Sequence, residues 1–396
     1  MIGLIFWLSI LGIFYVYAGY PLILALLVKF RPKMAPYKAE TPGVTLLITA
    51  YNEEDIIKAK LENSLKLDYP SDRLQILVAA DGSDDRTVAI IQSFAPKGVE
   101  LSYEPGRCGK MAAINRAVPR ARHAILVFSD ANNFYNVTTL RELVKPFSNP
   151  EVGAVAGSKT VAKEEGVLVE ADSLYWRYES YIKKQETRLG SCTGVSGEIF
   201  AIRRDLFEPP PVDVINDDFF LALSVIQKGY RIVYTPEARS WEYVSANERD
   251  EILRRSRIIA GRYQAIAMSI RKLPYRRPLV VWQVVSHKYL RPLVPFMMMG
   301  VFLANVAALI WNYPIKSLPL LFLSLPFNWL FFIAQIVFYL LAWIGTRVTF
   351  PGSLGKLLYL PTFLVNSNYA ALLGLYKYVT GRSTVIWEKV PRRINQ

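Results

Sequence analysis

Regular alternation of apolar and amphipathic segments from Gly43 to Phe147 constrains the fold more than any other feature of this chain. Short apolar runs predict buried strands, and the segments between them predict helices. The predicted strands span residues 44–49, 74–79, 99–103 and 124–128, and the predicted helices span 53–66, 87–94, 111–117 and 137–147. Strand–helix units of this length build a parallel, doubly wound α/β sheet with right-handed crossovers. Beyond them we predict long helices at 171–188 and 248–271 and a strand at 231–234.

Three polar clusters begin where three of these predicted strands end, at residues 49–54, 80–85 and 129–132. In doubly wound sheets, ligands bind beyond the carboxyl ends of the strands, where the direction of winding reverses. We therefore expect the three clusters to meet on one rim of the sheet and to form a ligand site there.

The first two clusters offer groups that suit a nucleotide. Tyr51 follows a strand directly, so its ring can cover a flat base, and Asp81 offers an acceptor to an imide or ribose donor. The alternative is structural, with Tyr51 packed on the sheet edge and Asp81 capping the next helix.

The third cluster offers oxygen ligands for a cation. Asp130 and Asn132 lie two residues apart at a strand terminus and therefore point the same way. One carboxylate and one amide oxygen, completed by phosphate oxygens, can hold Mg²⁺ or Mn²⁺, which would neutralise a leaving diphosphate. The alternative is an Asx-turn without a ligand.

A second pair of carboxylates stands where a later helix is expected to begin. A glycine-relieved turn runs into an apolar strand within residues 195–204, and Asn216, Asp217 and Asp218 then precede a helix that extends to residue 227. An acid just inside a helix start, near backbone that a ligand can approach closely, can act as general base towards a sugar hydroxyl. Alternatively, Asn216 and Asp217 only cap the helix.

Basic residues that could bind phosphate occur at two further places in the sequence. The glycine-flanked loop 106–110 carries Arg107 and Lys110 ahead of a helix and can cradle phosphates, although such cations are often merely solvated. Arg254 and Arg257 share one face of a basic helix, and they can reach either a diphosphate or anionic lipid.

The N-terminal sequence predicts a membrane anchor. Residues 2–28 are almost continuously apolar and carry no charge, and Lys29, Arg31 and Lys33 follow them. This pattern indicates an uncleaved transmembrane helix with the following domain in the cytoplasm. The net charge of +14 then fits anionic headgroups rather than nucleic acid. Two cysteines and two histidines argue against a disulfide framework or a histidine-based metal site.

The C-terminal part also predicts membrane helices. Residues 278–290 resemble an interface helix, 292–311 and 319–344 are long enough to span, and 357–376 form a third candidate span that central asparagines weaken. Three spans would place the basic tail outside, whereas its charge favours the inside. The expected domains are a transmembrane helix (1–30), a cytoplasmic catalytic domain (40–275), and an interface helix with a C-terminal transmembrane region (276–396).

Taken in this order, the motifs resemble the family 2 glycosyltransferases with the GT-A fold, in the membrane-embedded branch that includes cellulose, chitin, poly-N-acetylglucosamine and hyaluronan synthases. The resemblance covers residues 44 to about 264. It implies that Asp218, the last residue of Asn-Asp-Asp, is the catalytic base, and that Asp130 and Asn132 hold the metal. The implied donor-binding residues are Thr49, Tyr51, Glu53, Asp81, Lys110, Asp130, Arg254 and Arg257, and the residues assigned to the acceptor are Asp217 and Trp176.

The implied activity is an inverting transfer of sugar from a UDP-sugar to a saccharide or lipid-linked acceptor, in surface polysaccharide biosynthesis at the cytoplasmic membrane. Both a single transfer and processive synthesis with translocation stay open. The chain departs from the family pattern at Asn132, which replaces an aspartate, and at Arg254 and Ile258, which replace a glutamine and a tryptophan. These departures support a competing hypothesis, a non-catalytic glycan-binding or export subunit that retains the fold.

Overall fold

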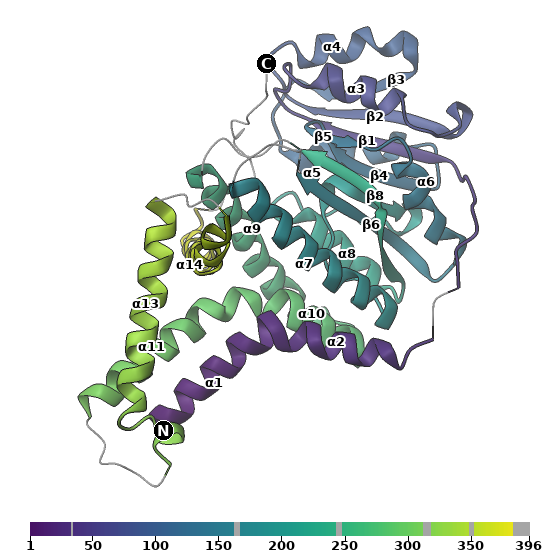
Figure 1. Cartoon of the computed structure of the whole chain (residues 1–396). Helices are drawn as coiled ribbons and strands as arrows, with labels where there is room; N and C mark the ends of the chain where they lie inside the picture. The colour runs from purple at the N-terminus through teal and green to yellow at the C-terminus, as the bar shows by residue number, and fades with distance from the viewer. Residues whose placement is uncertain (33–34, 162–166, 243–247, 312–317, 348–351, 383–396) are drawn as a thin grey trace.

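A computed structural model describes residues 1–32, 35–161, 167–242, 248–311, 318–347 and 352–382. Within these residues an eight-stranded mixed sheet has the strand order β3-β2-β1-β4-β7-β6-β8-β5 (Figure 1). The strands are β1 Val44–Ala50, β2 Leu74–Asp81, β3 Val99–Glu104, β4 Ile125–Asp130, β5 Asn133–Tyr135, β6 Val152–Val161, β7 Phe200–Arg203 and β8 Arg231–Glu242. The predicted α/β class is confirmed.

The parallel arrangement that the sequence predicts holds for only part of this sheet. Strands β3, β2, β1 and β4 pair in parallel. Strand β7 is antiparallel to both β4 and β6, and β5 is antiparallel to β8. The parallel arrangement predicted from residues 43–147 is confirmed for β3, β2, β1 and β4, and the antiparallel pairs lie beyond β4, where the chain inserts β7 between β4 and β6.

Helices cover both faces of the sheet, as parallel strands with no solvent-facing side require. All seven residues of β1 are buried. Alternate side chains enter different cores: Leu47 packs in one cluster with Ile114 of α5, and Leu46 packs in the other with Ile57 of α3. The helices of this part are α3 Ile57–Leu65, α4 Thr87–Ser93, α5 Lys110–Ala117, α6 Thr139–Val144, α7 Val167–Leu189, α8 Asp217–Gln227 and α9 Glu248–Ser269.

A second group of helices projects away from the sheet. It comprises α1 Ile2–Phe14, α2 Tyr20–Lys29, α10 Pro278–Val284, α11 Val294–Ile310, α12 Pro319–Phe322, α13 Phe327–Arg347 and α14 Gly352–Val379. Helix α1 runs beside α11, α13 lies beyond α11, and α2 reaches α7 under the sheet (Figure 1). Leu8, Leu11, Leu330 and Leu340 are each more than half exposed on these helices. Exposed leucines of this kind suit a lipid environment.

Three helices in the described part of the chain are long and apolar enough to cross a membrane: Ile2–Lys29, Pro278–Ile310 and Phe327–Arg347. The N-terminal span was predicted from the sequence. The predicted segments 278–290 and 292–311 belong to one continuous helical segment, Pro278–Ile310. The predicted start of the next span at residue 319 is wrong, because Leu323 takes a left-handed conformation with φ of 57° that ends α12, and the long helix begins only at Phe327.

The last predicted span, at residues 357–376, exists as helix α14 but is not among these three. Helix α14 lies along α9, so it joins the second helix group to the sheet domain. At the closest approach, a Cβ placed on Gly374 would stand 2.8 Å from the carbonyl oxygen of Ser256. A glycine is needed there because the two helix backbones nearly touch.

Candidate active site

The carboxyl ends of β1 and β4 bring three of the predicted site residues together. Thr49 and Asp130 are register partners on these strands, and the Thr49 hydroxyl donates to Oδ1 of Asp130 at 2.9 Å. Lys110, the first residue of α5, places its Nζ 2.9 Å from the same oxygen. Loops that follow the strands thus converge on one rim, as the polar clusters predict.

The first turn of α8 brings both predicted carboxylates to this rim. Nζ of Lys110 lies 3.6 Å from Oδ2 of Asp217. Oδ1 of Asp218 accepts the Phe219 N–H at 2.6 Å, so the carboxylate closes the helix N-terminus. Gly197 lies against the same group: a Cβ there would stand 3.3 Å from Cβ of Asp218 and 3.8 Å from Nζ of Lys110. The glycine turn therefore leaves the Asp218 side chain accessible.

Electrostatics distinguish Asp218 from Asp130, two of the carboxylates at this rim. Burial, with added repulsion from Asp217 and Glu198, raises the pKa of Asp218 to about 6. Burial alone would also raise the pKa of Asp130, but the charge and hydrogen bond of Lys110 outweigh it and hold that pKa below its usual value. Asp130 is therefore a permanent anion at neutral pH, whereas Asp218 has the pKa of a general base.

Asn132, the predicted metal ligand, carries a buried acceptor. The residue is 5% exposed, and its amide oxygen has no hydrogen-bond partner among the described residues. In the same set of residues, the hydrogen bonds and ion pair to Asp130 all reach Oδ1 and leave Oδ2 open. A carboxylate oxygen and an orphaned amide oxygen are the donor types that Mg²⁺ and Mn²⁺ prefer. The residues present therefore fit a divalent cation.

Asp81 and Tyr51, the residues predicted to bind a nucleotide, both contact the basic glycine loop 106–110. Asp81 is buried, and its two carboxylate oxygens accept the N–H groups of Cys108 and Gly109 at 2.9 and 2.8 Å. It thereby fixes the basic glycine loop, in which Gly109 has a φ of +93° that favours glycine. The Arg107 guanidinium lies 3.9 Å from the ring centroid of Tyr51. The basic loop therefore covers one face of the ring that was expected to meet a base.

Glu53 lies deeper than expected for a ligand-contacting residue. It is 6% exposed, and its N–H donates to the Thr87 hydroxyl at 2.7 Å, which ties the segment before α3 to the start of α4. The predicted helix start at residue 53 is also wrong, because α3 begins at Ile57. A contact of Glu53 with the donor stays a prediction.

The basic helix α9 faces the rim from the other side. Burial lowers the pKa of Arg257, and the nearby charges of Asp217 and Asp130 oppose that effect. The charge of Arg257 therefore interacts with these acids at a distance, although no ion pair joins Arg257 to Asp217 or Asp130 among the described residues. Arg254 lines a large cavity together with Asp218.

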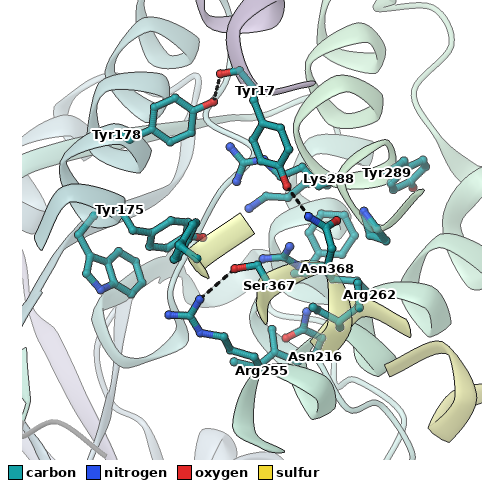
Figure 2. Close-up of a pocket in the computed structure, with 18 of the residues that line it drawn as sticks. Tyr17, Tyr175, Tyr178, Asn216, Arg255, Arg262, Lys288, Tyr289, Ser367 and Asn368 are labelled. Atoms are coloured by element: carbon teal, nitrogen blue, oxygen red, sulfur yellow. Dashed lines mark hydrogen bonds between the residues drawn. The ribbon is translucent and has the colours of Figure 1, made fainter. Parts of the chain in front are cut away.

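This cavity has a volume of about 710 Å³ and is lined by Asp218 and by residues of the projecting helices. Figure 2 shows part of this lining, including Tyr17 and Asn368. Trp176 of α7, assigned to the acceptor from the sequence, lines it, and so does Ile258. Trp241 does not line it and instead stacks on Phe134 with ring centroids 4.5 Å apart. A separate cleft of about 10 Å³, lined by Thr49, Lys110, Asp130, Asp217 and Asp218, adjoins it. Asp218 is common to both spaces.

Two lysines near the rim were missed from the sequence. Lys60 of α3 is fully buried, donates to the Ser129 hydroxyl at 2.7 Å, and has a pKa that burial lowers to about 7. Lys159 of β6 pairs with Glu198 at 2.7 Å and Glu242 at 2.5 Å. A lysine on an amphipathic helix is typical of a solvated face, and β6 was not predicted at all, so neither residue gave a signal.

A mixed α/β sheet with acids and cations at the carboxyl ends of its strands is the arrangement expected of a GT-A glycosyltransferase. Residues 42–258 match the family model described as "Glycosyltransferase like family 2", and the chain belongs to this family.

Relatives of known sequence agree. The chain is 26% identical over 212 residues to the poly-beta-1,6-N-acetyl-D-glucosamine synthase of Staphylococcus aureus, covering 52% of this chain and 51% of that protein. It is 29% identical over 226 residues to the probable glycosyltransferase YdaM of Bacillus subtilis, covering 53% of each. The chain thus spans about half the length of the curated relatives it matches.

One solved structure is similar over almost the whole chain. The mannosyltransferase PcManGT from Pyrobaculum calidifontis, in complex with GDP-Man and Mn²⁺, matches 96% of this chain and 100% of its own with a TM-score of 0.73 and 23% identity. The similarity therefore includes the projecting helices as well as the sheet and confirms the GT-A fold.

Proposed function

We propose that this enzyme transfers a sugar from a nucleotide sugar to an acceptor hydroxyl with inversion at the anomeric carbon. The observation that carries the proposal is the position of Asp218, which lines both the small cleft and the large cavity. The donor diphosphate occupies the side of Lys110 and Asp130, and the acceptor occupies the cavity. Only a group at the junction can face both reacting partners.

In this mechanism Asp218 removes the proton of the acceptor hydroxyl. The oxygen attacks the anomeric carbon from the side opposite the leaving group, the bond to the nucleoside diphosphate breaks, and the configuration inverts. Lys110 and Arg257 stabilise the charge that develops on the diphosphate. Asp130 and Asn132 would hold Mg²⁺ or Mn²⁺, with other ligands supplied by the donor phosphates. The cation would act as a Lewis acid on that leaving group.

The donor is proposed to be a UDP-sugar held at Tyr51 and Asp81, as the resemblance implies. The matched mannosyltransferase structure contains GDP-Man, which makes GDP-mannose the donor to test against UDP-sugars. Purified enzyme with Mn²⁺ is supplied with UDP-glucose, UDP-GlcNAc, UDP-glucuronate, UDP-galactose or GDP-mannose. Nucleotide release identifies the donor, and product length separates single transfer from processive synthesis.

The proposed location is the cytoplasmic membrane, with the sheet domain in the cytoplasm. The sheet domain follows the first of the three candidate spans, and α14 follows the third, so both lie on the same side. That arrangement agrees with the packing of α14 on α9. It also puts Lys29 and Arg31 on the same side as Lys377 and Arg382, in accordance with the positive-inside rule.

A non-catalytic glycan-binding or export subunit is the second candidate function, supported by Asn132 and Ile258. The absence of nucleotide release from every donor with Mn²⁺ present would favour it. Ile258 also bears on processivity, because it lines the cavity where the family pattern has an aromatic acceptor platform. An apolar wall at that point favours a single transfer over polymer extension.

A further inference from the structure

The large cavity has one apolar wall that comes from outside the catalytic sheet. Ile13 and Phe14 of α1 and Leu360, Phe363 and Leu364 of α14 line it. The first two belong to the candidate membrane span Ile2–Lys29. The apolar wall thus continues the lipid-facing surface of the helices towards Asp218. A water-soluble acceptor needs no such wall.

The cavity also carries an excess of positive charge. Six cationic side chains line the cavity and only two acidic ones do, Glu198 and Asp218. Arg255 donates to the Ser367 hydroxyl at 3.3 Å (Figure 2). Arg262 and Lys288 form no hydrogen bond or ion pair with any residue that the structure describes. Unpaired cations at a partly buried site call for an anionic ligand.

Arg291 adds an incompletely satisfied guanidinium to this group. It lines the cavity, its side chain is 11% exposed, and Nη1 pairs with Glu179. Its Nε and Nη2 atoms are buried and have no partner among the described residues. Leaving such donors unpaired is costly, and two adjacent guanidinium N–H groups match two oxygens of a phosphate.

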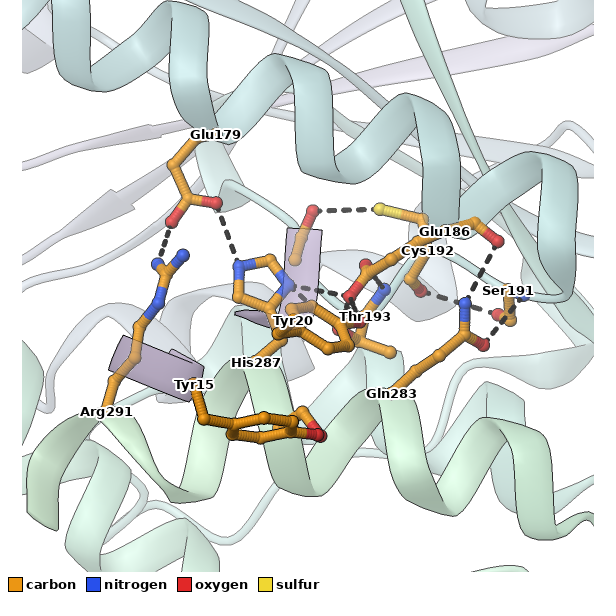
Figure 3. Close-up of polar contacts among 12 residues, drawn as sticks. Tyr15, Tyr20, Glu179, Glu186, Ser191, Cys192, Thr193, Gln283, His287 and Arg291 are labelled. Carbon is orange, nitrogen blue, oxygen red and sulfur yellow. Dashed lines mark hydrogen bonds and ion pairs between the residues drawn. The ribbon is translucent and has the colours of Figure 1, made fainter. Parts of the chain in front are cut away.

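A buried network holds Arg291 in this position (Figure 3). Glu179 contacts Arg291 with one oxygen and accepts a hydrogen bond from His287 Nε2 with the other at 2.9 Å, while His287 Nδ1 lies 2.8 Å from Glu186. Glu186 also accepts the Tyr20 hydroxyl at 2.5 Å. The network links α7 to both membrane-type helices and fixes the orientation of the guanidinium.

Two of the candidate spanning helices are irregular where they border the cavity. The spans contain π-helical turns at Tyr15–Gly19 and Val285–Tyr289. Each of these turns contributes residues to the cavity, Tyr17 from the first and Lys288 from the second. Wide turns of this kind are frequent at functional sites. The two helices are therefore reshaped where they border the cavity.

From these observations we infer that the acceptor is a lipid that bears a phosphate or diphosphate next to its sugar. Its chain lies against α1 and α14, its phosphate meets Arg262, Lys288 and Arg291, and its terminal sugar reaches Asp218. The inference rests on the proposed function and specifies the acceptor class. A neutral polysaccharide would leave the cations unpaired, and a free sugar phosphate would leave the apolar wall uncovered.

The experiment measures binding of farnesyl phosphate to the full chain in lipid nanodiscs, with farnesol and inorganic phosphate as comparison ligands. We expect farnesyl phosphate to bind at least about tenfold more tightly than farnesol. Arg262→Gln and Lys288→Gln should each weaken the binding of farnesyl phosphate by about tenfold, the loss expected for one charge-assisted hydrogen bond. Arg271→Gln, which removes an exposed cation beyond the cavity, is the matched control and should bind like the wild type.

Binding of UDP with Mn²⁺ is measured on each variant and should not change, which shows that the variants are folded and that the donor side is intact. Equal affinity for farnesyl phosphate and farnesol, or variants that bind farnesyl phosphate like the wild type, would overturn the inference. So would displacement by inorganic phosphate at equal concentration, which would identify a simple anion site. Nucleotide release with a neutral oligosaccharide as acceptor would refute the lipid while leaving the proposed transferase function standing.

Discussion

The two spaces that meet at Asp218 differ in how their charges are balanced. In the small cleft, Lys110 lies within 3.6 Å of two carboxylates, Asp130 and Asp217, and the space measures about 10 Å³. In the large cavity of about 710 Å³, Arg262 and Lys288 have no partner among the described residues. The cleft is small and its charges are internally paired, whereas the cavity is large and more cations than acids line it.

This difference shows how one enzyme can treat two substrates. Charges that are fixed in advance stabilise a developing charge without further reorganisation, which suits the step at the leaving group. Charges that await a partner suit recognition of a ligand, because the ligand then satisfies them. We therefore assign bond breaking to the cleft and acceptor selection to the cavity.

The largest effect is expected for Asp218→Asn, which removes the group shared by both spaces. Without a base, turnover should fall by about 10²- to 10⁴-fold, measured as nucleotide release, while binding of UDP with Mn²⁺ is retained. Asp213→Asn alters an exposed carboxylate on the same loop and serves as the control. Simultaneous loss of turnover and nucleotide binding would mean that Asp218 holds the fold rather than the proton.

Metal dependence tests the cleft by itself. Chelation with EDTA should abolish turnover, and Mn²⁺ or Mg²⁺ should restore it. Asn132→Asp adds a carboxylate to the proposed ligands, so the metal concentration for half-maximal turnover should fall by about tenfold. The control is Asn136→Asp at an exposed position. An unchanged metal requirement in Asn132→Asp would show that Asn132 is not a ligand.

The pH dependence follows from the raised pKa of Asp218, about 6. Only the carboxylate can accept a proton, so the turnover number should fall tenfold per pH unit below about 6 and level off above it.

The raised pKa of Asp218 also makes the stability of the fold depend on pH. The folded state holds this proton up to about pH 6 and the unfolded state only up to about 4, so the carboxyl destabilises the fold increasingly between these values.

Thermal unfolding of Asp218→Asn checks the sign. The variant should be more stable than the wild type above pH 6, by about 1 to 3 kcal/mol, and the gain should vanish near pH 4. A wild-type protein that is the more stable of the two at pH 8 would show that the carboxylate is favourably paired, contrary to its repulsion by Asp217 and Glu198.

The sequence predicted the cleft far better than the cavity, for a physical reason. Thr49, Lys110, Asp130 and Asp218 stand at strand ends or at helix starts, and the doubly wound topology brings such positions together wherever they occur. Their convergence therefore followed from local patterns. The antiparallel insertion of β7 and the strand β6 did not, because they depend on long-range pairing across α7.

The cavity was not predicted because its lining residues come from eight separate segments of the chain without a common motif. Arg262 and Lys288 appear as ordinary basic positions in the sequence, and Tyr17 lies inside an apolar span. These residues meet through long-range helix packing, such as that of α14 on α9. Trp176 was expected at the acceptor from the resemblance alone, and it lines the cavity.

The smallest effect is expected where the cavity wall is disturbed without touching its charges. Gly374→Ala places a Cβ 2.8 Å from the Ser256 carbonyl oxygen and must push α14 away from α9. Such overpacking costs about 1 to 3 kcal/mol. We expect a several-fold rise in KM for the acceptor and little change in KM for the donor, because the cleft lies on the sheet and does not contact α14. Steady-state kinetics with both substrates varied measures the two constants.

Val379→Ala is the control for this prediction, since that side chain is 72% exposed near the end of the same helix and should leave both constants unchanged. A larger rise in the donor KM than in the acceptor KM would mean that helix packing sets the geometry of the cleft. The two spaces would then act as one unit, and the separation of bond breaking from acceptor selection would fail at the point where the sheet domain meets the membrane helices.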